Sequence, residues 1–578
     1  MDRTLFLTAA FLTLFPQGLY SQPSPGAELR GVWITTAAGL DWPKTYNAGE
    51  QRASLKDMVA KLKVAHFNTI FFQVRARGDA YYRSTYEPWA ENLTGTLGKD
   101  PGYDPLQFLL DEAHAAGIEV QAWVNVFKVR GPGRVVNTYP LHPALRFAPH
   151  FIEVDGEGWL DPGIPAIRDY SVRVALEIIQ KYNIDGLMFD FLRYPGREFP
   201  DDDTYDRYGG KKNRDDWRRS NIDMFVSAIY DSARALKPMI KVGSAPIGIY
   251  DGDPDGDAFG AYYSYYQDSQ GWLAKGKHDY LVPQIYWDIG STKGDPDFAA
   301  LARKWQKGSH GRHIYTGIGA YKTNVLREIP TEIDTARKAG ALGQVYFRYE
   351  NIQTFDMFGG RYGQPAFLPA MAWKDSVPPN APRALAATEL GVNVFHVEWL
   401  PPLPARDGDS TKSYSLYRSS SPLQSDPRSR VLAAVLSASA TFYVDTISTP
   451  TSLRYYYTIS AIDPASNEGP PSNVAGTVVR EALDLKGRLA RITSLTTSLP
   501  HTAKSPTLIS YRLADRASVV LRLFKQGDDD SPVATLAEGI KDQGTYIVGL
   551  AQNTLAPGRY VLRLKAGSTE LEQAIDFR

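Results

Sequence analysis

The chain has 578 residues, which is too long for one ordinary hydrophobic core, so two to four domains are expected. Lys plus Arg and Asp plus Glu both number 64, and this zero formal charge gives no indication of a nucleic-acid partner or an anionic membrane. The chain has no cysteine, which excludes disulfides, thiolate metal sites and a cysteine nucleophile.

The N-terminal segment has the pattern of a secretory signal peptide. Arg3 precedes an apolar run over residues 5–15, and Pro16 and the small residue Ser21 follow. This pattern predicts a signal peptide over residues 1–21, so the mature protein is expected in the periplasm or outside the cell. The run is too short to span a bilayer comfortably. The alternative is an irregular buried N-terminal helix.

Residues 28–373 alternate apolar, strand-like runs with amphipathic helical stretches. Leu55, Met58, Val59 and Leu62, for example, follow helical spacing after the first strand. Such alternation predicts a parallel sheet, and eight units predict a closed (β/α)8 TIM barrel. The main alternative is an open doubly wound sheet, whose usual glycine-rich phosphate loop is missing after the first strand. The eight expected strands are 30–36, 68–74, 118–126, 184–190, 240–246, 279–286, 313–319 and 342–347.

The composition changes near residue 376, where a proline-rich linker precedes short strands that alternate at period two. Residues 376–480, with Trp399 on an early strand and Tyr455 entering a late one, predict a β-sandwich and resemble a fibronectin type III module. Residues 485–578 predict another β-sandwich and resemble the immunoglobulin-like domain of flagellar hook-capping proteins. We expect both units to be spacers or weak binding modules.

The candidate catalytic residues follow the predicted strands, because TIM barrels place their chemistry at the C-terminal strand ends. Asp190 ends the fourth strand, and glycoside cleavage commonly needs two carboxyl groups. We predict Asp190 as nucleophile or base, with Arg193 helping to keep it ionised. Asp288 and Glu350 are the candidate acids, Asp288 because the neighbouring Trp287 favours a raised pKa. The alternatives are a structural ion pair for Asp190 and ordinary loop roles for the other two.

The other side chains at the strand ends are aromatic rings, amides and arginines, a mixture that suits a sugar. Aromatic faces stack on pyranose rings, while amides and charged groups bind hydroxyls. The predicted substrate-binding residues are Trp33, Gln73, Arg75, Asn125, Arg193, Tyr194, Gln284, Tyr286 and Trp287.

One acidic loop resembles a calcium site, and no other cofactor is indicated. Asp251, Asp253 and Asp255 match the first half of a calcium loop, but the twelfth position is Tyr262 where the bidentate Glu is needed. A flexible acidic loop is therefore preferred over a calcium site.

Several motifs in chain order resemble the glycosyl hydrolase-like 10 family. They are the segments 28–35, 71–75, 79–82, 122–125, 159–163, 185–195 and 283–287, and the likeness covers nearly all of residues 28–373. The resemblance implies a (β/α)8 barrel in exported bacterial proteins. It also implies that at least some members cleave peptidoglycan glycan strands whose stem peptides have been removed. Family members often carry two adjacent acids at the fourth strand end, where this chain has Asp190 and Phe191.

The sequence thus predicts an exported glycoside hydrolase that acts on a bacterial cell-wall glycan or a related polysaccharide. No Glu follows Asp190 at the spacing of chitinase-type barrels, which disfavours a substrate-assisted mechanism. Two alternatives remain open. Phe191 suggests a glycan-binding protein that has lost catalysis, and the two sandwiches suggest a surface adhesion scaffold.

Overall fold

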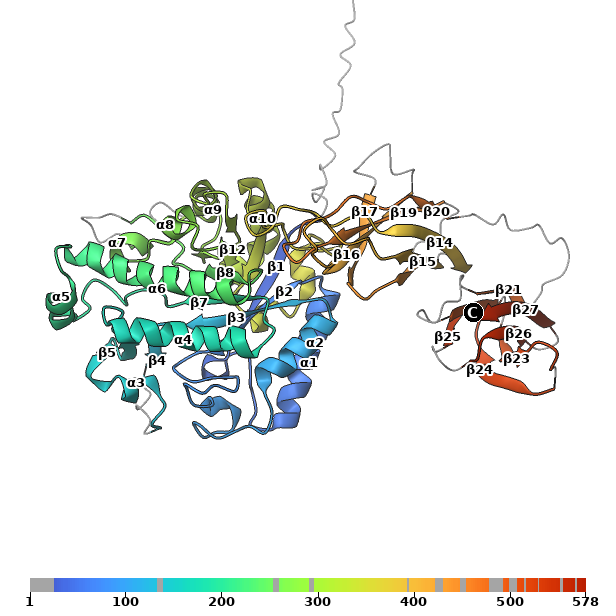
Figure 1. The fold of residues 1–578 in the computed structure, drawn as a ribbon, viewed down its shortest axis with the longest axis horizontal. Coiled ribbons are helices and arrows are strands. Elements are labelled where there is room, and N and C mark those ends of the chain that lie inside the picture. Colours follow the sequence, from blue (N-terminus) through green and yellow to red (C-terminus); the bar gives the residue numbers. More distant parts are fainter. Residues whose placement is uncertain are drawn as a thin grey trace, which may run out of the picture.

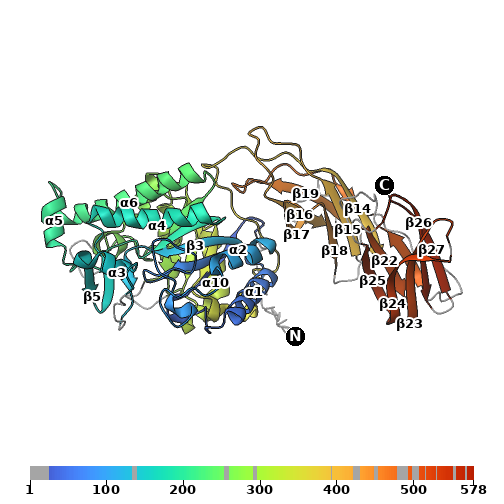
Figure 2. The ribbon, with the colours of Figure 1, turned by 60° about the horizontal axis from the view of Figure 1, so that its bottom comes forward.

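The computed structural model describes residues 25–132, 139–252, 259–290, 296–391, 394–420, 430–447, 454–477, 492–497, 507–513, 516–528, 530–550, 555–566 and 569–577. The molecule is elongated, with an α/β part at one end followed by two all-β parts (Figures 1 and 2).

The α/β part is a closed parallel barrel. Its strands are β1 (Leu29–Ile34), β2 (Thr69–Arg75), β3 (Glu119–Asn125), β7 (Gly186–Asp190), β8 (Lys241–Ser244), β9 (Tyr280–Leu281), β10 (Gln284–Ile285), β11 (His313–Ile314), β12 (Thr316–Ile318) and β13 (Gly343–Tyr346). β9 and β10 act as one strand that pairs with β11 and β12, because Tyr315 and Gly317 donate backbone hydrogen bonds to Leu281 and Pro283. The pairing of β13 with β1 closes the ring. The predicted TIM barrel is confirmed.

Helices connect successive barrel strands on the outside. They are α1 (Ala48–Val64), α2 (Pro105–Ala115), α4 (Pro165–Lys181), α6 (Arg214–Leu236), α8 (Ser269–Ala274), α9 (Phe298–Lys307) and α10 (Thr323–Ala339). α1 begins at Asn47, whose side chain accepts from the backbone N–H groups of Gly49 and Glu50. Its predicted stripe of Leu55, Met58, Val59 and Leu62 is buried against the sheet.

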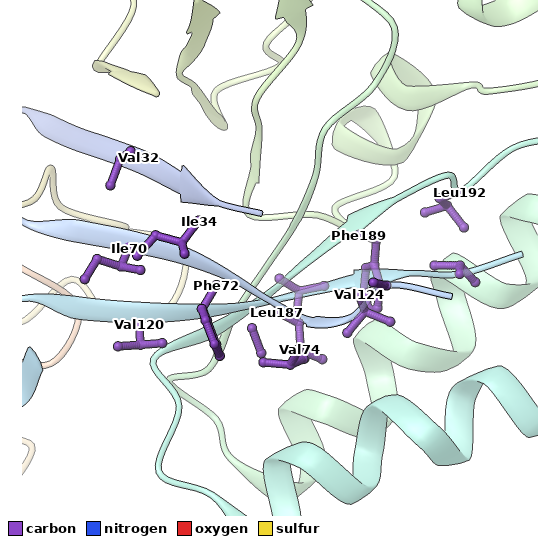
Figure 3. Packing of buried hydrophobic residues seen from close by; sticks show 14 of the residues in the cluster. Val32, Ile34, Ile70, Phe72, Val74, Val120, Val124, Leu187, Phe189 and Leu192 are labelled. Carbon is purple, nitrogen blue, oxygen red and sulfur yellow. The ribbon is translucent and has the colours of Figure 1, made fainter. Parts of the chain in front are cut away.

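Alternate side chains of each barrel strand enter two different hydrophobic clusters. Leu187 and Phe189 of β7 pack outward against the helices, as do neighbouring side chains of β1 to β3 (Figure 3). Met188 points inward and packs with Trp33 and Trp123 inside the barrel. Because side chains alternate along a strand, Asp190 shares the inward face with Met188 and lies at the C-terminal mouth of the barrel.

An insertion between β3 and α4 forms a small antiparallel sheet beside the barrel mouth. It contains β4 (Lys128–Arg130), β5 (Phe151–Val154) and β6 (Glu157–Leu160), with the short helix α3 (Pro143–Arg146) between β4 and β5. Two further short helices, α5 (Asp202–Tyr208) and α7 (Ala261–Ser264), lie in later connections.

The rest of the chain forms two β-sandwiches, each of one three-stranded and one four-stranded antiparallel sheet. The first contains β14 (Arg383–Gly391), β15 (Val394–Leu400), β16 (Ser413–Ser419), β17 (Arg430–Ser437), β18 (Phe442–Thr446), β19 (Tyr456–Ile462) and β20 (Ala475–Gly476). The second contains β21 (Ile492–Thr497), β22 (Thr507–Leu513), β23 (Ala517–Lys525), β24 (Pro532–Lys541), β25 (Gly544–Leu550), β26 (Gly558–Ala566) and β27 (Thr569–Phe577). The predicted order of a barrel followed by two all-β sandwiches is confirmed. None of the helices within the described ranges combines the length and apolar character that a membrane crossing requires.

Candidate active site

A pocket of about 310 Å³ opens at the C-terminal mouth of the barrel. Nearly every strand contributes to its wall with residues at or just beyond its C-terminal end, where TIM barrels place their chemistry. The lining residues are Trp33, Thr35, Ala37, Leu40, Gln73, Ala76, Arg77, Trp123, Asn125, Lys128, Gly131, Pro132, Asp190, Phe191, Arg193, Ala245, Ile247, Gln284, Tyr286 and Phe347.

Asp190 is the one carboxyl group among these lining residues. Its Oδ1 accepts hydrogen bonds from the backbone N–H of Phe191 at 2.7 Å and from Nε2 of Gln284 at 3.3 Å. Burial raises the pKa of Asp190 from 3.8 to about 6, although both hydrogen bonds, Arg193 and Lys128 lower it. Arg193 therefore favours the ionised form as predicted, but burial outweighs it.

Phe191 links Asp190 to a cluster of cations and aromatic rings. Its ring lies 5.8 Å from that of Trp159, 4.5 Å from Nζ of Lys128 and 5.3 Å from the guanidinium carbon of Arg193. Its backbone has φ 50°, the left-handed region that costs a residue other than glycine free energy. Phe191 thus packs Arg193 and Lys128 beside Asp190.

Aromatic rings form part of the pocket wall. Tyr286 stacks on Phe347 at 5.6 Å between ring centroids, and Phe347 also contacts Trp33 at 5.9 Å and Trp123 at 6.5 Å. Such packed rings hold a rigid apolar surface at the mouth of the barrel.

Two amides at the pocket are held in fixed orientations. Oε1 of Gln73 accepts from the backbone N–H groups of Thr36 and Ala37, and Nδ2 of Asn125 donates to the backbone oxygen of Ala76. Nε2 of Gln73 also donates to Oδ1 of Asn125 at 3.5 Å, so each amide is held both by the backbone and by the other amide.

The structure brings most of the predicted substrate-binding residues to the pocket, but three lie elsewhere. Arg75 is buried in an ion pair with Glu87 at 2.6 Å. Tyr194 is fully buried, and its hydroxyl oxygen accepts from Asn221. Trp287 lies outside the lining and 5.6 Å from Nζ of Lys322. The residues that do line the pocket are Trp33, Gln73, Asn125, Arg193, Gln284 and Tyr286.

Neither predicted acid lines the pocket. Glu350 forms ion pairs with Arg348 at 2.7 Å and with Lys44 at 3.1 Å, and Arg348 lowers the pKa of Glu350. A general acid needs the opposite shift. Asp288 lies close enough to Glu332 of α10 to contribute to its raised pKa, which burial, Glu328 and Asp288 together bring to about 9.

Two further predictions fall wholly or partly outside the described residues. Asp253 and Asp255 of the acidic loop lie there, and Asp251 pairs with Lys304 at 3.2 Å. The calcium hypothesis therefore stays a prediction. The proposed signal peptide over residues 1–21 also lies outside them.

Lys128 is the pocket residue that the sequence least suggested. It lies on β4 of the inserted sheet, beyond the end of β3, and forms an ion pair with Glu157 on β6. The Asp155-Gly156 pair is a turn signal for the neighbouring hairpin of β5 and β6, but the sequence around Lys128 does not show that β4 pairs with β6.

A TIM barrel with a carboxyl group, aromatic rings and oriented amides at its C-terminal mouth shares these features with glycoside hydrolases, although only one of their usual two carboxyl groups is present among the described lining residues. Comparison with known proteins agrees. The family model of glycosyl hydrolase-like 10 matches residues 28–332, and the chain belongs to this family.

Individual relatives of the chain are also named glycosyl hydrolases. Glycosyl hydrolase YngK of Bacillus subtilis (strain 168) is 30% identical over 479 residues, covering 77% of this chain and 92% of that protein. Glycosyl hydrolase DigH of Escherichia coli (strain K12) is 36% identical over 325 residues, covering 51% of this chain and 73% of DigH. Among solved structures, the PgaB (BpsB) glycoside hydrolase domain from Bordetella bronchiseptica aligns with a TM-score of 0.41 at 13% identity, over 58% of this chain and 98% of that domain.

Proposed function

We propose that the protein hydrolyses a bacterial cell-wall glycan, namely peptidoglycan strands stripped of their stem peptides, or a related polysaccharide. Asp190 is the carboxylate that acts as nucleophile or base. The observation that carries this role is that Asp190 is the one carboxyl among the residues lining the pocket. Both hydrogen bonds to its side chain are accepted by Oδ1, and no described residue donates a hydrogen bond to Oδ2.

The surroundings of Asp190 support this role. A carboxyl with a pKa of about 6 is ionised in most molecules at neutral pH, as a base or nucleophile must be. The aromatic wall of Tyr286 and Phe347 offers a stacking surface for a sugar ring. The fixed amides of Gln73 and Asn125 offer partners for sugar hydroxyls.

The test is release of soluble fragments with new reducing ends from peptide-stripped glycan strands. If Asp190 is a general base, we expect Asp190→Asn to lower kcat by about 10²–10⁴-fold, the contribution typical of a proton-transfer group. If Asp190 is the nucleophile, the loss should be larger. Asp203→Asn, at an exposed carboxylate of α5, is the matched control and should keep full activity. Equal release by wild type and Asp190→Asn would remove Asp190 from the mechanism.

A glycan-binding protein without catalysis is the second candidate, because the pocket lining holds a single carboxyl. Saturable binding to the same strands without any new reducing ends would favour this candidate, and turnover would exclude it. A surface adhesion scaffold would instead bind through the two sandwiches, so a variant altered in the pocket would bind as well as wild type.

We also propose that the protein is exported and acts outside the cytoplasm. The charge and apolar pattern of residues 1–21 supports export. Fractionation of cells that express the full chain tests it. A mature N-terminus near residue 22 in the periplasm or medium is expected, and an unprocessed cytoplasmic protein would contradict it.

A further inference from the structure

Two cations, Lys128 and Arg193, line the pocket close to Asp190, which is the one carboxyl among the described lining residues. Lys128 is neutralised by its ion pair with Glu157. Arg193 forms no ion pair with a carboxylate of the described residues, although it lies beside Asp190 and lowers its pKa.

Arg193 is held in place by aromatic rings. Its guanidinium carbon lies 4.7 Å from the ring centroid of Tyr265, 5.2 Å from that of Trp159 and 5.3 Å from that of Phe191. Its one hydrogen bond within the described chain runs from Nη1 to the backbone oxygen of Tyr194 at 3.1 Å. A guanidinium has five N–H donors, so most of them remain available to a ligand in the pocket.

Such an arrangement is costly unless an anion completes it. Burial lowers the pKa of Arg193, although the charge of the nearby Asp190 raises it. A desolvated charge destabilises a protein until it is paired and hydrogen-bonded. The three rings flank the guanidinium, and Arg193 lines the pocket, so a ligand there can reach it.

We propose that Arg193 binds a carboxylate carried by the substrate sugar, beside the bond on which Asp190 acts. This inference rests on the function proposed above. It adds that the pocket selects a sugar with a carboxylate substituent. A carboxylate matches the planar fork of a guanidinium and can accept two parallel hydrogen bonds. Two sugars supply this chemistry: a muramic acid, whose lactyl carboxyl becomes free when an amide-cleaving reaction removes the stem peptide, and a hexuronic acid.

The first experiment compares stripped glycan strands with the same strands after methyl esterification of the lactyl carboxyl. For wild type, we expect kcat/KM to be about 10- to 100-fold higher on the free acid, as charge-assisted hydrogen bonds imply. Arg193→Met should bring the ratio of kcat/KM on the free acid to kcat/KM on the ester close to one. Because Arg193 also lowers the pKa of Asp190, the activity on both substrates changes in this variant, and the ratio is the quantity that tests the inference. Arg193→Lys should keep part of the preference, because charge remains but the fork is lost.

The matched control is Arg219→Met. Arg219 also lies over a tyrosine ring, 4.4 Å from that of Tyr262, but it pairs with Asp216 and is outside the pocket lining. This variant should keep the wild-type preference for the free acid. Thermal melts of all variants identify any that fail to fold. If Arg193→Met does not fold, the ratio of kcat/KM on the free acid to kcat/KM on the ester in Arg193→Lys decides the question.

A second substrate distinguishes the source of the carboxylate. Cleavage of a hexuronate oligosaccharide with the same dependence on Arg193 would assign the site to uronic acids. Selective cleavage of the stripped strands would assign it to the lactyl group. Wild type that cleaves acid and ester equally, or Arg193→Met that keeps the preference, would overturn the inference.

Failure of the proposed function has a different signature. If no substrate releases reducing ends, the hydrolase proposal fails, and the same acid-to-ester comparison is made from dissociation constants of wild type and Arg193→Met. A preference for the acid that depends on Arg193 would then support the carboxylate site in a binding protein. Equal dissociation constants would overturn it.

Discussion

Two opposing effects determine the chemistry of Asp190. Burial raises its pKa, while the N–H groups of Phe191 and Gln284 and the charges of Arg193 and Lys128 lower it. The result, a pKa of about 6, lies near the operating pH of a proton-transfer group. The side chain is thus mainly ionised at neutral pH and becomes protonated under mildly acidic conditions.

This pKa predicts the pH dependence of hydrolysis. If Asp190 acts as base or nucleophile, kcat/KM rises about tenfold per pH unit below pH 6 and levels off above it, because only the ionised carboxylate reacts. The measurement is kcat/KM on stripped glycan strands from pH 4 to 8, with protein stability checked at each pH. A rate that falls as pH rises through 6 would instead identify Asp190 as the general acid.

The same pKa predicts a cost in stability. The folded pKa of about 6 exceeds the usual value of 3.8, so between about pH 4 and 6 the folded protein holds a proton that the unfolded chain has lost. Stability from this group therefore falls as pH rises through that window. At pH 7 the penalty is fully present and amounts to at most about 3 kcal/mol.

Asp190→Asn removes the penalty, because the amide is uncharged at every pH. The variant should have a higher Tm than wild type at pH 7, and the difference should shrink toward pH 4. Thermal unfolding of both proteins at the two pH values checks this, with Asp203→Asn as the exposed control. An Asp190→Asn Tm at or below that of wild type at pH 7 would show that the carboxylate is stabilised by its neighbours.

At the scale of the element, alternation along a strand explains why Asp190 was predictable. In β7, Leu187 and Phe189 face the helices and Met188 faces the barrel interior, so the register fixes Asp190 on the inward face at the mouth. Asn125, which pairs in register with Asp190, and Gln73 and Gln284 on other barrel strands also line the pocket.

Residues beyond the last paired strand position were not predictable in this way. Glu350 lies in a 3-10 turn after β13, where Arg348 and Lys44 bind its carboxylate. Arg75 does end β2, but its sequence neighbourhood does not reveal that Glu87 neutralises it in the core. Lys128 reaches the pocket from an inserted hairpin whose position depends on tertiary packing. In each case a partner distant along the chain decides where the side chain lies.

At the scale of the whole molecule, the first sandwich contributes to the floor of the barrel, at the end opposite the pocket. Glu119 on the inward face of β3 binds Lys241 of β8 at 2.7 Å and also pairs with Lys412, which precedes β16 of the sandwich. Lys412 lies 4.0 Å from Asp185, which pairs with His114 at 2.8 Å. A cavity of about 270 Å³ beside this network is lined by both parts of the chain.

This network predicts that the barrel and the first sandwich depend on each other for stability. Glu119→Gln leaves Lys241 and Lys412 close together without their shared carboxylate, and breaking a buried pair costs about 3–5 kcal/mol. We expect a clear loss in Tm and in the denaturant midpoint. Lys412→Met should cost less, because Glu119 keeps its pair with Lys241.

The control is Glu153→Gln, which removes the partner of Arg130 on the inserted sheet, where the Glu153 side chain is 57% exposed. Such a surface pair contributes about 1 kcal/mol at most. Unfolding curves of the full chain, followed by both tryptophan fluorescence and circular dichroism, measure all three variants. A Lys412→Met midpoint equal to that of Glu153→Gln would show that the two parts are joined without energetic coupling, because Lys412 is the member of the network that comes from the sandwich. A larger loss in Lys412→Met would show that the sandwich stabilises the barrel, and deleting the sandwiches would then destabilise the barrel as well as remove their binding surfaces.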